Sequence, residues 1–190
     1  MNLFSYLDQT KENIEATKTN ELSTEMARAI ELAVNVIRSK KMIAVAGNGG
    51  SMADAQHLSG ELVNYFTRSH NAFPVLTLGV NSSVSSAWAN DFEFAAQLER
   101  EFSAYTEFCG MVIVFTTSGK SENINRLLEK ASQEGIPSVA FASEIAISNF
   151  KILPNILLCP KVRNTSRIQE IHVNLMHYFC QEIENQVTEL

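Results

Sequence analysis

Two groups of side chains in this sequence have the types and spacing that acid–base chemistry or metal binding requires. His57 and Glu61 are four residues apart, so they share one face of a helix. Much later, Gln169 and His172 are three apart and share a face of another expected helix, which continues to His177. At 3.6 residues per turn, His177 is offset from Gln169 by about 80°. Either histidine can therefore be the one that is bonded inside the core, and spacing does not decide between them.

The chemistry that these groups allow is proton transfer next to a carbonyl. A buried glutamate is a natural base for such a proton, and histidine exchanges protons near neutral pH. The donor atoms of His57, Glu61, Gln169 and one later histidine also suit zinc, although glutamine is an uncommon ligand. On spacing alone, a His–Glu pair on a solvated helix face is an equal alternative.

Three polar segments rich in small residues could bring a ligand to these groups. Gly47 to Ser51 lets the backbone approach a ligand, but it lacks the spacing of a dinucleotide or Walker motif. Thr116 to Ser121 offers hydroxyl groups and helix N–H groups to a phosphate, with added charge from Lys120. The alternative for Ser121 is a simple helix cap. Asn90 to Phe92 either contacts a sugar hydroxyl or caps a helix through its aspartate.

Short apolar runs precede these segments and are expected to be strands buried on both faces of a parallel sheet. The runs are Met42–Ala46, Pro74–Leu78, Met111–Phe115, Pro137–Phe141 and Ile156–Cys159. Expected helices alternate with them, at Met52–Phe66, Ser82–Ala89, Phe92–Phe102, Glu122–Gln133, near Ile145 and at Arg167–Val187. This alternation predicts an α/β fold with a three-layer, doubly wound, five-stranded parallel sheet and an N-terminal helical arm over residues 1–41. We expect one domain over residues 1–190.

Composition limits the classes of partner. The charged fraction of 19% is below the usual ~25%, so many helix faces are expected to be buried, some between subunits. A net charge of −6 gives no basic footprint for nucleic acid. An odd count of three cysteines argues against a disulfide framework and favours the reducing cytoplasm. No apolar run approaches the ~20 residues of a membrane span, and the first ten residues lack an apolar signal core.

Taken together, the motifs resemble those of the phosphoheptose isomerases, a family with the sugar isomerase (SIS) fold. The resemblance extends in order from about Met42 to Glu184. The segments that carry it are Gly47-Asn48-Gly49-Gly50-Ser51 with His57 and Glu61, Asn90-Asp91-Phe92, Thr117-Ser118-Gly119 with Ser121, and Arg167-Ile168-Gln169-Glu170 with His172 and His177.

The resemblance implies a flavodoxin-like SIS fold and a ketose–aldose isomerisation through an enediol. The expected reaction interconverts sedoheptulose 7-phosphate and D-glycero-D-manno-heptose 7-phosphate, toward the heptose of bacterial surface polysaccharide such as lipopolysaccharide. Glu61 would move the proton between carbons, and His177 would serve the oxygens. The expected substrate-binding residues are Asn48, Gly49, Gly50, Ser51, Glu61, Asn90, Asp91, Thr116, Thr117, Ser118, Ser121 and Gln169.

The same resemblance implies one zinc ion per subunit and a homotetramer, with the N-terminal helices at subunit interfaces. The zinc ligands would be His57, Glu61, Gln169 and His177. The chain departs from the family pattern at several positions, which bear on substrate identity more than on reaction type. They are Gly60, Tyr65, Asn81, Lys120, Ser166 and the stretch Ala142-Ser143-Glu144.

Two non-enzymatic readings remain for an SIS chain. One is an adaptor that binds the replication initiator DnaA; it keeps the Arg-Ile-Gln-Glu stretch but lacks the glutamate and the last histidine. The other is a sugar-phosphate sensor, for which no appended DNA-binding segment is present here. The presence of Glu61 and His177 favours catalysis.

Overall fold

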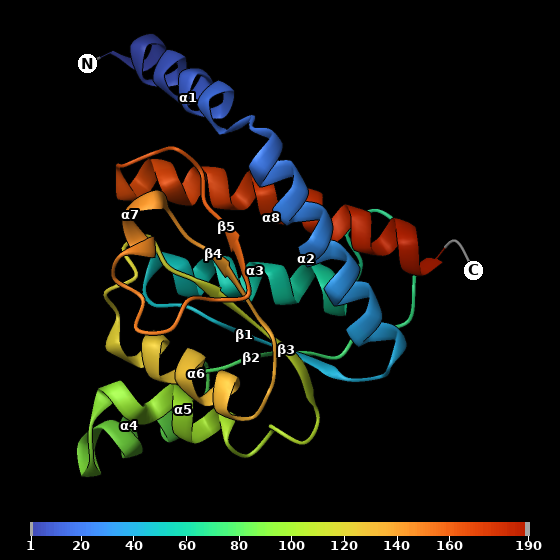
Figure 1. Ribbon diagram of the computed structural model, residues 1–190, viewed down its shortest axis with the longest axis vertical. Helices are drawn as coiled ribbons and strands as arrows, with labels where there is room; N and C mark the ends of the chain where they lie inside the picture. The colour runs from blue at the N-terminus through green and yellow to red at the C-terminus, as the bar shows by residue number, and fades with distance from the viewer. Residues whose placement is uncertain (1, 189–190) are drawn as a thin grey trace.

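The five apolar runs form one parallel sheet in the computed structural model, which describes residues 2–188 (Figure 1). The strand order is β2-β1-β3-β4-β5, and every neighbouring pair is parallel. The strands are β1 Met42–Ala46, β2 Val75–Thr77, β3 Cys109–Phe115, β4 Ser138–Phe141 and β5 Ile156–Leu158. The predicted α/β fold with a five-stranded parallel sheet is confirmed.

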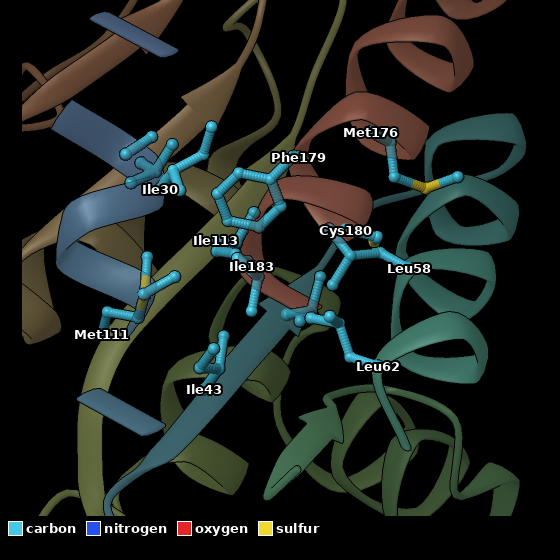
Figure 2. Packing of buried hydrophobic residues seen from close by; sticks show 14 of the residues in the cluster. Ile30, Ile43, Leu58, Leu62, Met111, Ile113, Met176, Phe179, Cys180 and Ile183 are labelled. Atoms are coloured by element: carbon cyan, nitrogen blue, oxygen red, sulfur yellow. The ribbon is translucent and has the colours of Figure 1, made fainter. Parts of the chain in front are cut away.

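Two layers of helices cover the sheet because alternate strand residues face opposite sides. Ile43 and Val45 of β1 pack with α2 (Asn20–Arg38), α3 (Gly50–Val63) and α8 (Thr165–Thr188). Figure 2 shows this core, with side chains from α2, α3 and α8 meeting those of β1 and β3. Ala44 and Ala46 face the other layer, which contains α5 (Gln97–Phe102) and α6 (Glu122–Gln133).

The carboxyl ends of β1 and β3 form the switch point of this sheet. From β1 the chain crosses to β2 at one side, and from β3 it crosses to β4 at the other. Ligands of doubly wound sheets bind in the crevice at this point. The loops that follow these two neighbouring strands are the two small-residue loops of the sequence, 47–49 and 116–121, so they begin at the same edge of the sheet.

The helix after β2 differs from the prediction. Asp91 was a candidate helix N-cap, but it is the last residue of α4 (Ser82–Asp91) and accepts a hydrogen bond from Asn90 at 2.8 Å. Asp91 therefore does not cap the following helix, and the N-cap of η1 is Glu93. The start of α4 is capped by Asn81, whose side chain accepts from the amides of Ser83 and Val84. A short η1 (Phe94–Ala96) then leads into α5.

The N-terminal helix α1 (Leu3–Thr17) extends away from the sheet (Figure 1). It exposes Leu3, Phe4 and Leu7, whereas α2 buries a long apolar face against the sheet. A short α7 (Glu144–Ile147) follows β4. Within residues 2–188, no helix combines the length and apolar character needed to cross a bilayer.

Candidate active site

The loop after β1 is built from glycines for geometric reasons. Gly49 has a φ of 56°, in the left-handed region that glycine adopts without strain. A Cβ on Gly47 would lie 2.2 Å from the backbone oxygen of Ser51, so a side chain does not fit there. The tight turn lets α3 begin at Gly50, and the free N–H groups of its first turn are presented at the sheet edge.

The loop after β3 presents hydroxyl groups at the same edge. Gly119 has a φ of +67°, and a Cβ there would lie 2.5 Å from the backbone oxygen of Ala146. Thr116 Oγ1 accepts a hydrogen bond from the Gly119 amide at 3.2 Å, which fixes the turn. Ser121 occupies the N-cap position of α6, yet its side chain makes no capping hydrogen bond. Its hydroxyl is therefore available to a ligand.

Between these loops and the start of α8 lies a pocket of about 270 Å³. Three helix N-termini meet there, because α3 begins at Gly50, α6 follows Ser121 and α8 begins at Thr165. Such termini favour anions, and no charged side chain is among the described residues that line the pocket. The geometry therefore suits a phosphate. The lining residues are Asn48, Gly50, Ser51, Phe115, Thr116, Thr117, Ser118, Ser121, Thr165 and Gln169.

Asn48 is held in place by Asn123, a residue that the sequence reasoning missed. The two side-chain amides exchange two hydrogen bonds of 2.9 Å each. Asn123 is buried at the start of α6 and also bonds the amide of Ile124. This pair joins the β1 loop to the helix that follows β3. Its position two residues after Ser121 was the signal that could have suggested it.

Gln169 reaches the pocket from α8 and lies directly over Gly50. A Cβ at position 50 would lie only 2.6 Å from Gln169 Nε2 and 2.9 Å from its Oε1. The glycine at this position therefore makes room for the amide of Gln169. Sequence spacing alone gave no sign of this contact, because the two residues come from distant segments.

Two turns along α3, three candidate acid–base groups converge. Glu61 Oε1 lies 2.9 Å from His57 Nε2, and His177 Nε2 lies 3.3 Å from the same nitrogen. One ligand atom from each residue falls within 4.8 Å of the others, an arrangement that could hold a metal ion. The side chains of His57 and Glu61 are 42% and 23% exposed, so solvent or a ligand reaches them.

His172 is the structural histidine. It is fully buried, and its Nε2 bonds the backbone oxygen of Ala142 at 2.7 Å. Burial lowers the pKa of His172 to about 4, although the bond to Ala142 opposes this shift. The rings of Phe115 and Phe141 lie near the imidazole at interplanar angles of 65° and 78°. The choice that spacing left open is thereby resolved in favour of His177 as the histidine at the site.

The Arg-Ile-Gln-Glu stretch contacts two different parts of the molecule. While Gln169 lines the pocket, Arg167 and Glu170 bind α1. The buried Arg167 guanidinium lies 3.4 Å from the ring centroid of Tyr6 and donates to Thr10 Oγ1. Glu170 accepts from the Tyr6 hydroxyl at 2.8 Å and from Arg167. These bonds anchor the helical arm.

Two predicted substrate-binding residues lie apart from the pocket in this chain. Asn90 and Asp91 are exposed at the end of α4 and bond each other. Neither belongs to the lining of the pocket, and their contact with a sugar stays a prediction. Lys120 is exposed and is likewise outside the lining.

The chain is similar to known proteins over most of its length. The SIS domain family model matches residues 5–143. A phosphoheptose isomerase of Clostridium acetobutylicum is 31% identical over 183 residues, covering 94% of this chain and 93% of the relative. One from Aquifex aeolicus is 35% identical over 153 residues, covering 80% of each. A phosphoheptose isomerase structure from Francisella tularensis superposes with a TM-score of 0.86 at 26% identity, over 96% of both chains.

Proposed function

Because the chain belongs to the phosphoheptose isomerases of the SIS domain family, we propose that it interconverts sedoheptulose 7-phosphate and D-glycero-D-manno-heptose 7-phosphate. As an aldose–ketose isomerase, it would supply the heptose of a bacterial surface polysaccharide. The convergence of Glu61 with two histidines favours an enzyme over an adaptor or a sensor.

The observation that carries this proposal is the two-part site along α3. The phosphate pocket includes Ser51, and the acid–base group begins six residues later at His57, about 9 Å further along the helix. A heptose 7-phosphate has its phosphate at one end and reacts at carbons 1 and 2 at the other. The two ends of one substrate thus correspond to the two parts of the site.

The roles follow from position and chemistry. Glu61 removes a proton from carbon 1 or carbon 2 and returns it to the neighbouring carbon. His177 transfers the proton between the two oxygens, and His57 lies within hydrogen-bonding distance of both catalytic groups. The helix N-termini and the hydroxyl groups of Thr117 and Ser121 hold the phosphate.

A zinc ion fits the donor atoms of the acid–base group. The 3.3 Å between the Nε2 atoms of His57 and His177 is close to the roughly 3.3 Å that separates two nitrogen ligands of one tetrahedral zinc. Glu61 supplies an oxygen, and Gln169 is the proposed fourth ligand. When bound, zinc would polarise the substrate oxygens at carbons 1 and 2. We propose one ion per subunit.

We further propose a cytoplasmic homotetramer in which α1 contacts neighbouring subunits. The exposed apolar residues of α1 and the low charged fraction support this arrangement. Sedimentation of the purified protein would test it; a monomer at micromolar concentration contradicts it.

The experiment for the reaction is an assay with sedoheptulose 7-phosphate, other ketose phosphates and the Glu61→Gln variant. Wild-type protein should isomerise the heptulose phosphate, and Glu61→Gln should abolish turnover while the protein stays folded. Full turnover by Glu61→Gln contradicts the assigned base. Faster turnover of another ketose phosphate contradicts the assigned substrate but not the reaction type.

A further inference from the structure

Glu184 is a fully buried carboxylate on α8 that the proposed chemistry does not use. It lies seven residues after His177, two helical turns further along the same face. Both of its oxygens accept hydrogen bonds from the segment that follows α3. Oε1 accepts from the amide of Phe66, and Oε2 accepts from the amide and hydroxyl of Thr67 at 2.7 and 2.8 Å and from the amide of Arg68 at 3.1 Å.

The charge of Glu184 is compensated at this position. Burial opposes its ionisation, but the amides of Phe66 and Thr67 hold the pKa of the carboxyl below its usual value. His70 adds a buried partner, with Nε2 at 3.1 Å from Glu184 Oε1 and Nδ1 at 2.8 Å from the Asn71 oxygen. The His70 ring thus joins the carboxylate of Glu184 to the backbone oxygen of Asn71.

The first residue of the segment that Glu184 holds is in contact with the catalytic histidine. The ring of Phe66 stacks on that of His177, with centroids 5.0 Å apart and planes at 18°. On another side the His57 ring meets His177 edge-on, with centroids 4.9 Å apart and planes at 80°. The His177 ring is therefore confined by two neighbours, and its Nε2 points at His57.

We propose, on the basis of the function proposed above, that Glu184 is a positioning residue for the isomerisation. It fixes Phe66 against α8, and Phe66 sets the orientation of the His177 ring. The helices α3 and α8 lie side by side (Figure 1) and contact each other at several points along their length. Gln169 covers Gly50, His177 meets His57, and Glu184 holds the chain just beyond α3.

Glu184→Gln tests the proposal because the two side chains have the same shape. Oε1 faces the amide of Phe66, and Oε2 faces the amides of Thr67 and Arg68. Either orientation of the new amide therefore places its NH₂ against at least one backbone N–H group. Phe66→Leu removes the stacking ring and keeps the backbone amide that Glu184 binds. Glu182→Gln is the matched control on the same helix, since its half-buried carboxylate bonds only Asn185 among the described residues.

Two readouts separate positioning from a general structural role. In steady-state kinetics, Glu184→Gln and Phe66→Leu should each lower kcat by about 10- to 100-fold while KM changes less than about two-fold, because the phosphate pocket lies at the other end of α3. In NMR spectra, assigned by comparison with His177→Gln, the His177 ring signals should lose the ring-current shift from Phe66 in both variants. The Glu182→Gln variant should match wild type in both readouts.

Several outcomes overturn the proposal. One is a folded Glu184→Gln protein with wild-type kcat and unmoved His177 signals; another is a change in the signals of all four histidines together with a rise in KM. If Glu184→Gln does not fold, Phe66→Leu decides, and wild-type behaviour of that variant refutes the role of the stack. If wild type fails to isomerise sedoheptulose 7-phosphate, the proposed function is wrong, and the NMR comparison still tests the positioning.

Discussion

Replacing Gly50 with alanine should lower the activity of this protein without lowering its stability. Gly50 begins α3 directly beneath Gln169. Its new Cβ would lie 2.6 Å from Gln169 Nε2, whereas unstrained contacts begin near 3.4 Å. The amide of Gln169 must therefore retreat by roughly 0.8 Å or rotate out of the pocket.

The expected magnitudes differ for the two properties. Displacement of a positioning group by about 1 Å can cost about 100-fold in rate, or about 2.7 kcal/mol in the activation barrier. Stability should change little, because the displaced atoms are at the end of a flexible side chain. Gly50→Ala should thus lower kcat/KM by about 100-fold with a Tm equal to or slightly above that of wild type.

Gly60→Ala is the matched control, because it adds the same methyl group to the same helix. A Cβ at position 60 meets no atom within 4 Å, so Gln169 is undisturbed. Replacing a glycine inside a helix should stabilise the protein by about 0.5–1 kcal/mol and leave kcat/KM unchanged. The measurements are steady-state turnover of sedoheptulose 7-phosphate and thermal unfolding. Wild-type kcat/KM in Gly50→Ala would refute the argument that Gln169 must occupy its observed position.

Three further predictions concern single groups. The folded pKa of His172 is about 4, below the unfolded value of 6.5, so wild-type stability falls as pH drops through this window. Between pH 7 and pH 4 this lowers the free energy of unfolding of the wild type by about 3 kcal/mol. His172→Asn should not show this decrease when both proteins are unfolded by urea titration at the two pH values. Burial raises the pKa of Asp54 to about 6, so Asp54→Asn should gain stability over wild type as pH rises from 4 to 7 in the same titrations. Metal analysis of protein purified without chelator should find zinc near one per subunit, and His177→Ala should lose it; full occupancy in that variant contradicts the ligand set.

The fold could be predicted from the sequence because parallel strands buried on both faces consist of consecutive apolar residues. The run Met42–Ala46 and the helix Glu122–Gln133 have the predicted bounds. The helix predicted to end at Phe66 ends at Val63, because the amides of the next segment bond Glu184 instead of continuing the helix. A tertiary contact of this kind cannot be read from local pattern.

The site was only partly accessible. His57 and Glu61 could be paired from spacing, and His177 is now chosen over His172 by burial. Glu184 was missed because one glutamate in an amphipathic helix looks like a solvated position. Its role depends on backbone amides, which carry no signature in a sequence.

The anchoring of α1 by Arg167 and Glu170 bears on how related sequences are interpreted. Only one residue of the Arg-Ile-Gln-Glu stretch faces the pocket, while two hold the helical arm through Tyr6 and its neighbours. A descendant that loses catalysis but keeps the arm remains under selection for the arginine and the glutamate of this stretch. The Arg-Ile-Gln-Glu stretch therefore indicates a fold with an anchored helical arm. An assignment of enzyme activity should depend on Glu61 and His177 instead.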